Sequence, residues 1–397
     1  MKMIKTVDLD VGHDHRTVVA GINLEAMPGQ MIAVLGPNGA GKSTILKSLS
    51  ALLAPIQGAI YVGGQELMRM KRSTLSKTLA VVLTDRLNAG FLTAFEVAAM
   101  GRYPHTGFFG KLTGADKEAV WECLRTVNAL DLAERYFNQL SDGEKQKIML
   151  ARALAQEPNL IILDEPTTHL DVKHKLDVMA ILRKLSREKG ITVIFSLHEI
   201  DLALKSCDMA ILVKDGKIMN VGSPEKLGNH ETFAALFDIE SAGFSAFMGT
   251  IEISNQIEPS VFVVGGAGTA TGIYRMLTKN NLGFYTGILH ENDVDCYIAE
   301  TIGVVAVKEK PFRHMGQQAF AAARDLMNET RLVVDSGCPI AESNLANQHL
   351  VLGALKEGQR VCSLRDEKEN RLLYGAWADM ILPCRTAPDI LAYCAAL

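Results

Sequence analysis

The chain has 397 residues, more than one ordinary domain uses, which predicts two or three domains. Hydrophobic residues make up 48% and charged residues 22%, values typical of globular proteins with substantial cores. The net charge of −4 lacks the basic surplus of nucleic-acid-binding proteins, so we expect no nucleic-acid partner. The seven cysteines include no C-x-x-C pair, which indicates free thiols in a reducing cytosol.

No targeting or membrane-spanning segment is predicted. Acidic residues interrupt the N-terminal stretch before any apolar core forms, so it does not have the pattern of a signal peptide. No run of about eighteen apolar residues is present. A role at a membrane would therefore require partner chains.

Residues 1–30 are predicted to form two strands around a polar bend, Gly12 to Arg16. Met31 to Leu35 is a short apolar run of strand type, and helical spacing follows over Thr44 to Leu53. Between them lies the pattern G-x-x-x-x-G-K-[ST], which in this context predicts a phosphate-binding loop. The loop and the residue after it are Gly36, Pro37, Asn38, Gly39, Ala40, Gly41, Lys42, Ser43 and Thr44.

The composition of this loop suits a nucleoside triphosphate. Glycines let successive backbone amides point at the β-phosphate, and the helix N-terminus adds its positive dipole end. Lys42 can reach the β- and γ-phosphates, and the Ser43 hydroxyl can take one position on Mg²⁺. A glycine-rich turn without a ligand is the alternative, and the flanking strand and helix disfavour it.

The next segments alternate between extended and helical patterns. Short strands are predicted at Tyr61 to Val62 and at Leu79 to Leu83, and a helix over Thr93 to Arg102. Gly101 to Val120 is a turn-rich excursion that ends in a helix. Gln139 to Gln156 is strongly helical after its opening residues, LSDGE.

Two acids end the next buried strand, Leu160 to Leu163. Asp164 can hold Mg²⁺, directly or through water, and Glu165 is then placed to orient or deprotonate an attacking water. An acidic turn at a strand end is the alternative. The strand Ile191 to Ser196 leads to His198; a lone histidine is usually structural, but this strand-end position favours contact with a γ-phosphate.

Two short segments carry less information by themselves. Ser141 to Glu144 is an ordinary capping box, although small residues at a helix N-terminus also make an anion site. His169-Leu170-Asp171 follows the acid pair and leads into a helix that ends at Lys189. A hairpin over Met209 to Val221 follows the short helix after His198.

The pattern restarts near Gly249 as alternating strands and helices, which predicts a parallel sheet covered on both faces. We therefore expect a first domain at 1–248, a linker at 249–258 and a smaller Rossmann-like α/β domain at 259–397. After the strand that follows Pro259, strands are predicted at 284–289, 304–307, 332–334 and 361–364. Helices are predicted at 273–278, 296–301, 317–328, 347–356 and 388–396.

Five motifs of the first domain, in this order, resemble the ATP-binding subunit of ABC transporters. GPNGAGKST resembles the Walker A loop, LSDGE the signature that is usually LSGGQ, IILDEP Walker B, HLD with Asp171 the D-loop, and His198 the switch histidine. The resemblance covers roughly residues 1–245. It implies a P-loop NTPase fold with a helical subdomain, and ATP and Mg²⁺ as cofactors.

The resemblance also implies site roles. Lys42, Glu165 and His198 would be catalytic, and Ser43 and Asp164 would hold the metal. Two copies of the chain would sandwich two ATP molecules. In each site, Ser141 and Gly143 of one copy would close on the nucleotide bound by the other.

Three positions depart from the family pattern. His13 stands where an aromatic residue usually stacks on adenine, and its planar ring can still stack. Thr84 stands where a glutamine usually senses Mg²⁺ and the permease; its hydroxyl, or the carboxylate of Asp85, could be the oxygen ligand instead. Asp142 adds a negative charge to the signature, and nothing in the sequence explains it.

Within the family, Gly101 to Pro104 and Phe108 to Leu112 are similar to importers of iron–siderophore, haem and cobalamin. That similarity implies integral-membrane permease subunits, an indirect role for a substrate-binding protein, and a peripheral location at the cytoplasmic face of the inner membrane. The alternative is a soluble ABC-type switch. Such proteins tend to carry two ABC units or a coiled-coil insertion, whereas this chain has one Walker A loop and no heptad run.

The second domain has a glycine turn, Gly265 to Gly272, between a strand and a helix. Its spacing departs from the dinucleotide fingerprint, and we weigh a nucleotide or small-anion site equally against a structural turn. His290, Glu291, Asp293 and Asp295 follow the next strand, where an acid could bind a ribose, and Asp335 to Cys338 ends another. The domain is a candidate ligand sensor. No nucleophile–base pair that would make it an enzyme is recognisable.

Overall fold

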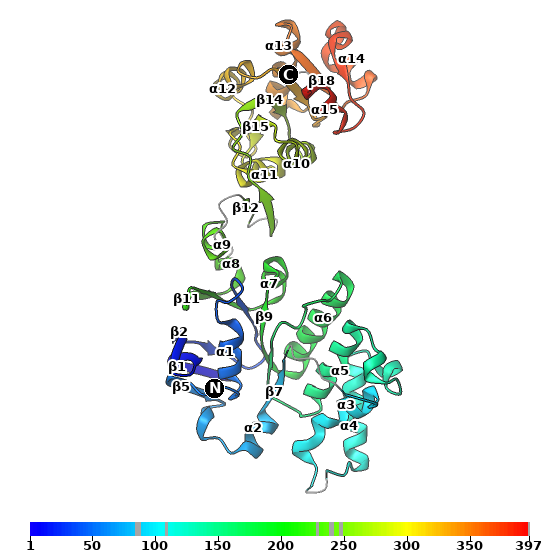
Figure 1. Cartoon of the computed structure of the whole chain (residues 1–397). Coiled ribbons are helices and arrows are strands. Elements are labelled where there is room, and N and C mark those ends of the chain that lie inside the picture. Colours follow the sequence, from blue (N-terminus) through cyan, green and yellow to red (C-terminus); the bar gives the residue numbers. More distant parts are fainter. Residues whose placement is uncertain (84–88, 108–109, 228–229, 238–241, 246–248, 396–397) are drawn as a thin grey trace. The chain divides into compact units, whose positions relative to one another are not determined.

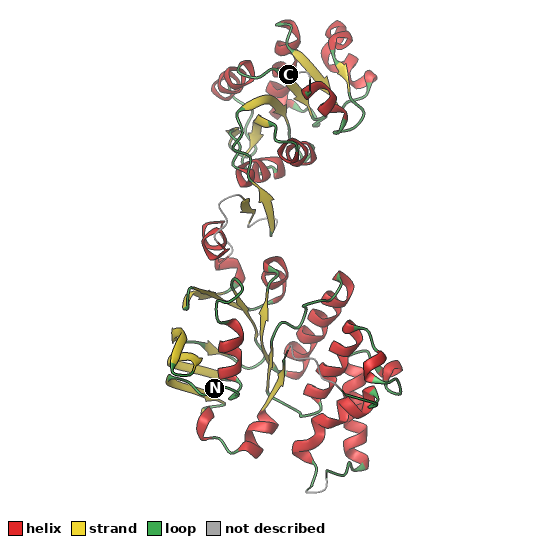
Figure 2. Cartoon of the chain, viewed as in Figure 1, coloured by secondary structure: helices red, strands yellow, loops and turns green. Residues whose placement is uncertain are grey.

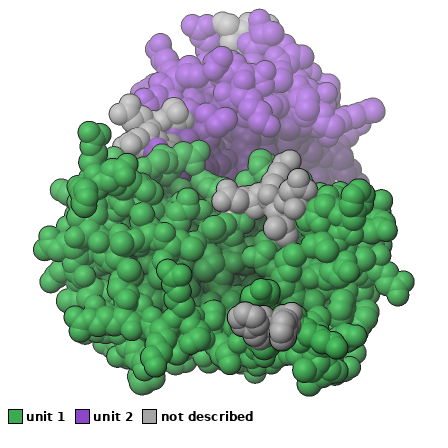
Figure 3. Space-filling model, turned by 60° about the horizontal axis from the view of Figure 1, so that its bottom comes forward, with its two compact units in different colours: residues 1–228 green, residues 229–397 purple. Residues whose placement is uncertain are grey.

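The computed structural model describes residues 1–83, 89–107, 110–227, 230–237, 242–245 and 249–395. The chain forms two compact units, residues 1–228 and residues 229–397, which are coloured separately in Figure 3.

One mixed sheet forms the centre of the first unit (Figures 1 and 2). Its strand order is β6-β5-β1-β2-β11-β10-β4-β9-β8-β7, with β3 beside β1. Strands β10, β4, β9, β8 and β7 run parallel, and β2, β1, β5 and β6 pair antiparallel. The bounds are β1 Ile4–His13, β2 Arg16–Ile22, β3 Glu25–Ala26, β4 Met31–Leu35, β5 Gln57–Val62, β6 Gln65–Glu66, β7 Leu79–Val82, β8 Leu160–Leu163, β9 Thr192–Leu197, β10 Met209–Lys214 and β11 Lys217–Gly222.

The parallel strands explain why the sequence shows continuous apolar runs there. Strands β4, β8 and β9 are buried at every position, as expected for strands covered on both faces. Because parallel strands end at the same edge of a sheet, the residues that follow β4, β8 and β9 come together. These are the phosphate loop, the acid pair and His198.

A group of helices forms a subdomain of the first unit, in which α3, α4 and α5 pack on one another (Figure 1). Each begins with a capping box, and the one at Ser141 and Glu144 was predicted. The helices of this unit are α1 Lys42–Leu49, α2 Arg72–Thr78, α3 Ala94–Ala99, α4 Gly114–Thr126, α5 Asp142–Leu154, α6 Val172–Lys189, α7 Ile200–Ser206 and α8 Pro224–Leu227, with 3-10 turns η1 Leu67–Arg69, η2 Met100–His105, η3 Leu130–Leu132 and η4 Phe137–Gln139.

The importer-like pair Gly101 and Arg102 belongs to the packing of this subdomain. A Cβ on Gly101 would lie 2.0 Å from the carbonyl oxygen of Arg152, so only glycine fits there. Arg102 is 7% exposed. Its guanidinium donates to Asp116 Oδ1 at 3.0 Å and to Glu157 Oε1 at 2.8 Å, which ties η2 to α4 and to the end of α5.

The second unit contains a six-stranded parallel sheet in the order β16-β15-β14-β17-β18-β19. Counted along the chain this order is 3-2-1-4-5-6, which is typical of doubly wound sheets. The strands are β14 Pro259–Val264, β15 Gly283–His290, β16 Ala306–Glu309, β17 Leu332–Asp335, β18 Arg360–Ser363 and β19 Leu382–Pro383.

Alternate residues of β14 face the two helical layers of this sheet. Val261 and Val263 pack with α10, α11 and α15, whereas Phe262 and Val264 pack with α12 and α13. The predicted helix 317–328 is confirmed without change; α14 and β19 were not predicted. The helices are α9 His230–Phe237, α10 Thr271–Lys279, α11 Val294–Ile302, α12 Gln317–Asn328, α13 Leu345–Lys356, α14 Glu367–Tyr374 and α15 Asp389–Cys394, with 3-10 turns η5 Glu342–Asn344 and η6 Gly375–Met380.

The division between the units differs from the boundary that we placed at 249–258. Strands β12, Ala242–Ser245, and β13, Thr250–Ile253, form an antiparallel pair within the second unit. Gly243 lies so close to α11 that a Cβ would be 2.0 Å from the carbonyl oxygen of Thr301. On β13, Glu252 accepts a hydrogen bond from Arg275 Nε at 2.9 Å. The short pair of strands therefore packs with the second unit.

A buried carboxylate joins β17, β18 and α14. Asp335 is fully buried and accepts hydrogen bonds from Arg365 Nε at 2.8 Å, Tyr374 Oη at 2.7 Å and Ser363 Oγ at 3.1 Å. Burial by itself lowers the pKa of Arg365, but the charge of Asp335 outweighs it and raises that pKa. Burial also raises the pKa of the Tyr374 phenol.

Replacing Arg365 should destabilise the second unit strongly. Arg365→Met leaves Asp335 buried without its cation, and such a loss costs about 3 kcal/mol or more of the free energy of unfolding. Urea denaturation followed by Trp377 fluorescence, in a Trp121→Phe background, measures it. The control is Lys308→Met, which breaks an ion pair with Glu300 whose side chains are 42% and 46% exposed. It should cost less than about 1 kcal/mol. Equal losses in the two variants would contradict the role given to Asp335.

Candidate nucleotide-binding site

The loop between β4 and α1 requires glycine at two positions. Gly41 has a φ of 100°, and a Cβ there would lie 2.4 Å from Cγ2 of Val19. A Cβ on Gly36 would lie 2.1 Å from the carbonyl oxygen of Val213. The loop therefore passes close to β2 and β10, and Gly41 is the N-cap of α1.

The side chain of Lys42 lies inside this loop. It is 5% exposed, and its Nζ donates to the carbonyl oxygens of Gly36 at 2.9 Å and Pro37 at 3.0 Å. Burial lowers the pKa of Lys42, and the nearby charges of Glu165 and Asp164 act in the opposite direction. The ammonium group is thus fixed within the loop and faces two carboxylates.

Ser43 and Asp164, which are far apart in the sequence, meet at the start of α1. The Ser43 hydroxyl donates to Asp164 Oδ1 at 3.1 Å. The same oxygen accepts a hydrogen bond from the Ser196 hydroxyl, at 2.8 Å, and Asp164 is 7% exposed. The three side chains come from α1, from the end of β8 and from β9, so the sheet edge itself brings them together.

Glu165 and His198 form a direct pair at the same edge. His198 Nε2 lies 2.7 Å from Glu165 Oε1, and the Thr168 hydroxyl donates to Oε2 at 3.0 Å. Burial by itself would raise the pKa of Glu165, but the hydrogen bonds from His198 and Thr168 and the charge of Lys42 lower it below its ordinary value. Glu165 therefore carries its charge at neutral pH and can accept a proton.

The backbone of Glu165 is held in an uncommon conformation. Its φ is 49°, in the left-handed region, and its amide donates to Ser196 Oγ at 2.8 Å. A non-glycine residue in that region costs on the order of 1 kcal/mol, and such residues cluster at functional sites. Ser196 thus supports both acids at once. Sequence reasoning did not assign Ser196 a role, although a serine between Phe195 and Leu197 was a visible signal.

His13 lies beside the start of α1. Its exposed ring has Nε2 at 3.4 Å from the Thr44 hydroxyl. The ring is therefore next to the phosphate loop, at the last residue of β1. Thr84 and Asp85, the predicted oxygen ligands, lie outside the described residues, as do Phe108 and Phe109 of the importer-like segment.

Ser141, Gly143 and Asp171 form a second group in the first unit. Within the described residues, the hydrogen bonds of the Ser141 hydroxyl are those of its capping box with Glu144. A Cβ on Gly143 would lie 2.3 Å from the ring of His174, and that ring shares a hydrogen bond of 2.8 Å with Asp171 Oδ1. The signature residues and the D-loop acid are thus neighbours. No hydrogen bond in the described part of the chain joins them to Lys42 or Ser43.

Several backbone amides of the glycine turn in the second unit already have hydrogen-bond acceptors within the protein. Asp295, fully buried in α11, accepts from the amides of Gly266 at 2.9 Å, Ala270 at 3.1 Å and Thr271 at 2.8 Å. Asp293 accepts from the amide of Ala267 at 2.7 Å. Asp293 and Asp295, two of the residues that we considered for a ribose, therefore bind the turn itself and occupy four of its amides.

The other candidates of the second unit serve the fold. His290 Nε2 lies 2.8 Å from the carbonyl oxygen of Arg313. All seven cysteines of the chain are buried free thiols, as expected for small hydrophobic side chains.

Across the residues that the structure describes, no group of three or more His, Cys, Asp or Glu side chains could hold a metal ion. A search of the same residues finds no helix that could cross a membrane.

The phosphate loop, the strand-end acids and the central parallel strands define a P-loop nucleoside triphosphatase fold. The ABC transporter family matches residues 19–168, and the MJ0874 family matches residues 284–388. An uncharacterised ABC transporter ATP-binding protein of Methanocaldococcus jannaschii is 44% identical over 289 residues, which are 72% of this chain and 100% of that protein. The chain therefore belongs to the ATP-binding proteins of ABC transporters.

Two of the similar proteins are ATP-binding proteins named for import or transport. The cobalamin import ATP-binding protein BtuD of Halobacterium salinarum is 32% identical over 79% of this chain and 81% of its own length. The ferric enterobactin transport ATP-binding protein FepC of Escherichia coli is 32% identical over 58% of this chain and 85% of its own length.

Two solved structures are also similar to this chain. An inward-facing metal-chelate type ABC transporter is 28% identical over 60% of this chain and 89% of that chain, with a TM-score of 0.54. A post-hydrolysis dimer of an ATP-binding cassette bound to ADP and Pi is 28% identical over 56% of this chain and 99% of that chain, with a TM-score of 0.50.

Removing the Ser196 hydroxyl should impair ATP hydrolysis. Ser196→Ala leaves Asp164 and the amide of Glu165 without their common partner, and the loss of such a support costs about 10- to 100-fold in metal affinity or activity. The measurement is phosphate release at increasing Mg²⁺ concentration. Ser48→Ala is the control, because Ser48 is also a buried serine but its hydroxyl has no hydrogen-bond partner among the described residues. Wild-type rates in Ser196→Ala would show that Ser196 does not support the two acids.

Proposed function

We propose that this chain is the ATP-hydrolysing subunit that powers import of a metal chelate or cofactor through a partner permease. The compound would be an iron–siderophore complex, haem or cobalamin. The observation that carries the ATPase half of this proposal is the meeting of Ser43, Asp164, Glu165 and His198 at one sheet edge. Membership of the transporter family and the names of the relatives support the import half.

Mg²⁺ would be held by Ser43 and Asp164. A hydroxyl and a carboxylate oxygen 3.1 Å apart are the kind of oxygen ligands that this ion prefers, so the residues fit it. The ion neutralises charge on the β- and γ-phosphates when it is bound. Thr84 is proposed as a further oxygen ligand on the basis of the sequence alone.

Hydrolysis would use the charged form of Glu165. The loop from Gly36 to Thr44 cradles the phosphates, and Lys42 contacts the β- and γ-phosphates. Glu165 accepts a proton from the water that attacks the γ-phosphorus. His198 orients Glu165 and contacts the γ-phosphate. Because the pKa of Glu165 lies below its ordinary value, the base is present at neutral pH, and activity is lost as the pH falls through that pKa.

The complete site would need a second copy of the chain. Ser141 and Gly143 would contact the γ-phosphate bound by the partner copy, with Asp171 beside them, and His13 would stack on the adenine in its own copy. The exposed capping box at Ser141 and the dimer of the similar ATP-binding cassette support this arrangement.

Among the compounds considered, the extent of the matches favours cobalamin. The cobalamin relative is matched over 79% of this chain, more than the first unit contains, so that match extends into the second unit. The ferric enterobactin relative is matched over 58%. The proposed partners are permease subunits and, indirectly, a substrate-binding protein. The proposed location is peripheral, at the cytoplasmic face of the inner membrane.

A soluble ABC-type switch is the second candidate, and reconstitution distinguishes it from a transporter subunit. The measurement is the ATPase rate of the protein in proteoliposomes that contain the permease. For a transporter subunit, we expect the rate to rise when substrate-loaded binding protein is added. A rate that responds to neither permease nor binding protein would favour the soluble switch.

Removing the proposed base should trap the nucleotide-bound dimer. Glu165→Gln keeps the shape of the side chain but cannot accept the proton, so we expect turnover to fall by at least about 100-fold while ATP remains bound. Light scattering coupled to gel filtration should then detect a dimer with ATP and Mg²⁺. Hydrolysis at the wild-type rate would remove Glu165 from the base role.

A second substitution tests the contribution of the partner copy. Ser141→Arg, added to Glu165→Gln, places a long side chain where the partner's nucleotide would bind. It should prevent the dimer but leave ATP binding by each chain intact. A dimer that forms equally well would argue against closure by the signature.

A further inference from the structure

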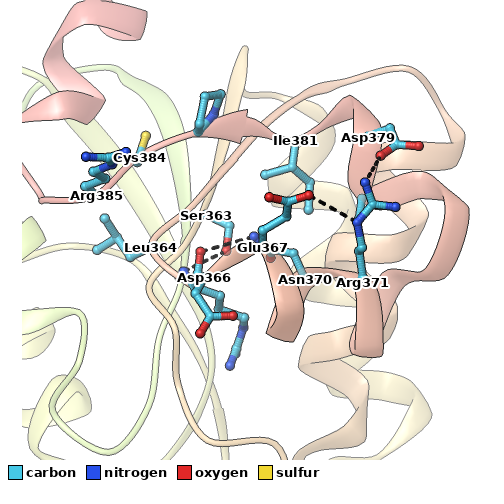
Figure 4. A pocket seen from close by; sticks show the side chains of 13 residues that line it. Ser363, Leu364, Asp366, Glu367, Asn370, Arg371, Asp379, Ile381, Cys384 and Arg385 are labelled. Carbon is cyan, nitrogen blue, oxygen red and sulfur yellow. Dashed lines mark hydrogen bonds and ion pairs between the residues drawn. The ribbon is translucent and has the colours of Figure 1, made fainter.

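Two further groups of charged side chains lie outside the contacts proposed for the nucleotide. One lines a hollow of about 610 Å³ beside β18 and β19 in the second unit (Figure 4). There, Arg371 donates to Glu367 at 3.3 Å and to Asp379 at 3.0 Å, so these charges balance one another. The other is at the first turn of α6 in the first unit, which contacts both the signature and the segment after His198.

His174 lies in this first turn of α6 and is held by the N-cap residue of the helix, Asp171. The backbone amide of His174 and its ring Nδ1 each lie 2.8 Å from Asp171 Oδ1. The hydrogen bonds from the backbone amide and from the ring lower the pKa of Asp171, so its carboxylate is charged at neutral pH. Because a carboxylate only accepts hydrogen bonds, Nδ1 carries the hydrogen, and this bond orients the ring.

The ring of His174 packs against the backbone of the signature. A Cβ on Gly143 would lie 2.3 Å from Cδ2 and 2.5 Å from Cγ of this ring, so the ring fits there only beside a glycine. About one turn further along both helices, Lys147 on α5 donates to Asp177 on α6 at 3.1 Å. The start of α6 therefore supports the start of the signature helix.

The next residue of α6 contacts the nucleotide site of the same chain. Lys175 donates to Glu199 Oε1 at 2.5 Å, and the Thr167 hydroxyl donates to Glu199 Oε2 at 3.2 Å. Glu199 follows His198 directly, and Thr167 lies just after the acid pair at the end of β8. The turn that carries His174 is thus anchored to the segments that follow β8 and β9.

We propose that His174 is a positioning residue for the signature. Held by Asp171, its ring keeps the backbone at Gly143 in the place from which Ser141 and Gly143 of one copy contact the nucleotide of the partner copy. His174 acts through Gly143 and not on the nucleotide itself. This role rests on the closed dimer proposed above, and it adds a residue to which no role was assigned there.

Ultracentrifugation of the Glu165→Gln chain with saturating ATP and Mg²⁺ measures the dimer directly. Adding His174→Ala should raise the dissociation constant of the ATP-bound dimer by about tenfold, because each dimer loses the hydrogen bond and the ring contact twice. The affinity of a single chain for ATP should not change. Calorimetry measures that affinity after Ser141→Arg is added to both chains to prevent the dimer.

His105→Ala is the matched control. The ring of this half-buried histidine also lies near α5, but at the opposite end, where Nε2 is 2.9 Å from the carbonyl oxygen of Gln156. Its replacement should leave both the dimer and the ATP affinity unchanged. The side chain of His174 is 29% exposed, so its own replacement should not unfold the unit.

An unchanged dissociation constant in His174→Ala would overturn this role. An equal loss of single-chain ATP affinity would also overturn it, because the effect would then reach beyond the signature. If Glu165→Gln by itself forms no dimer, the closed dimer of the proposed function fails. A dimer that forms in Glu165→Gln but does not respond to His174→Ala removes only the role given to His174, so the two failures are distinguishable.

Discussion

The carboxylate of Asp164 is the point on which the arrangement of the first unit depends. It is buried at the end of β8, and it accepts hydrogen bonds from Ser43 at the start of α1 and from Ser196 in β9. Ser196 also holds the amide of Glu165, which in turn pairs with His198. The proposed metal-binding pair and the proposed base are thus fixed by one network, because three parallel strands end at the same edge.

At the carboxyl edge of the sheet in the second unit, the acidic side chains bond to other parts of the same unit. Its strand order and glycine turn resemble those of dinucleotide-binding sheets, yet Asp295 and Asp293 occupy four of the turn's amides. A glycine turn after a strand therefore does not identify a ligand site unless its amides are free. Asp335 is likewise committed to Arg365 and Tyr374.

The sequence was most informative where chemistry requires a fixed spacing. The phosphate loop, the acid pair after β8 and the capping box at Ser141 are local patterns, and each is present in the structure. The helix α14 was missed because its charged sequence resembles a loop, although Asp366 and Glu369 mark its start. The bonds of Asp295 could not be predicted, because they depend on how α11 packs against a turn distant in sequence. The boundary was misplaced for a similar reason, because β12 and β13 pack against α11, which lies further along the chain.

The central claim is that one triphosphate is bound by the loop of one chain and closed by Ser141 and Gly143 of another. Vanadate-directed photocleavage tests it in a mixture of two differently tagged variants, Lys42→Ala and Ser141→Arg. Vanadate takes the place of the γ-phosphate and cuts the backbone beside it. The account predicts a cut near Ser141 in the Lys42→Ala chain, which binds no nucleotide itself, and only when the other variant is present. A cut near residue 141 that falls only in the Ser141→Arg chain, which holds the nucleotide, would contradict it.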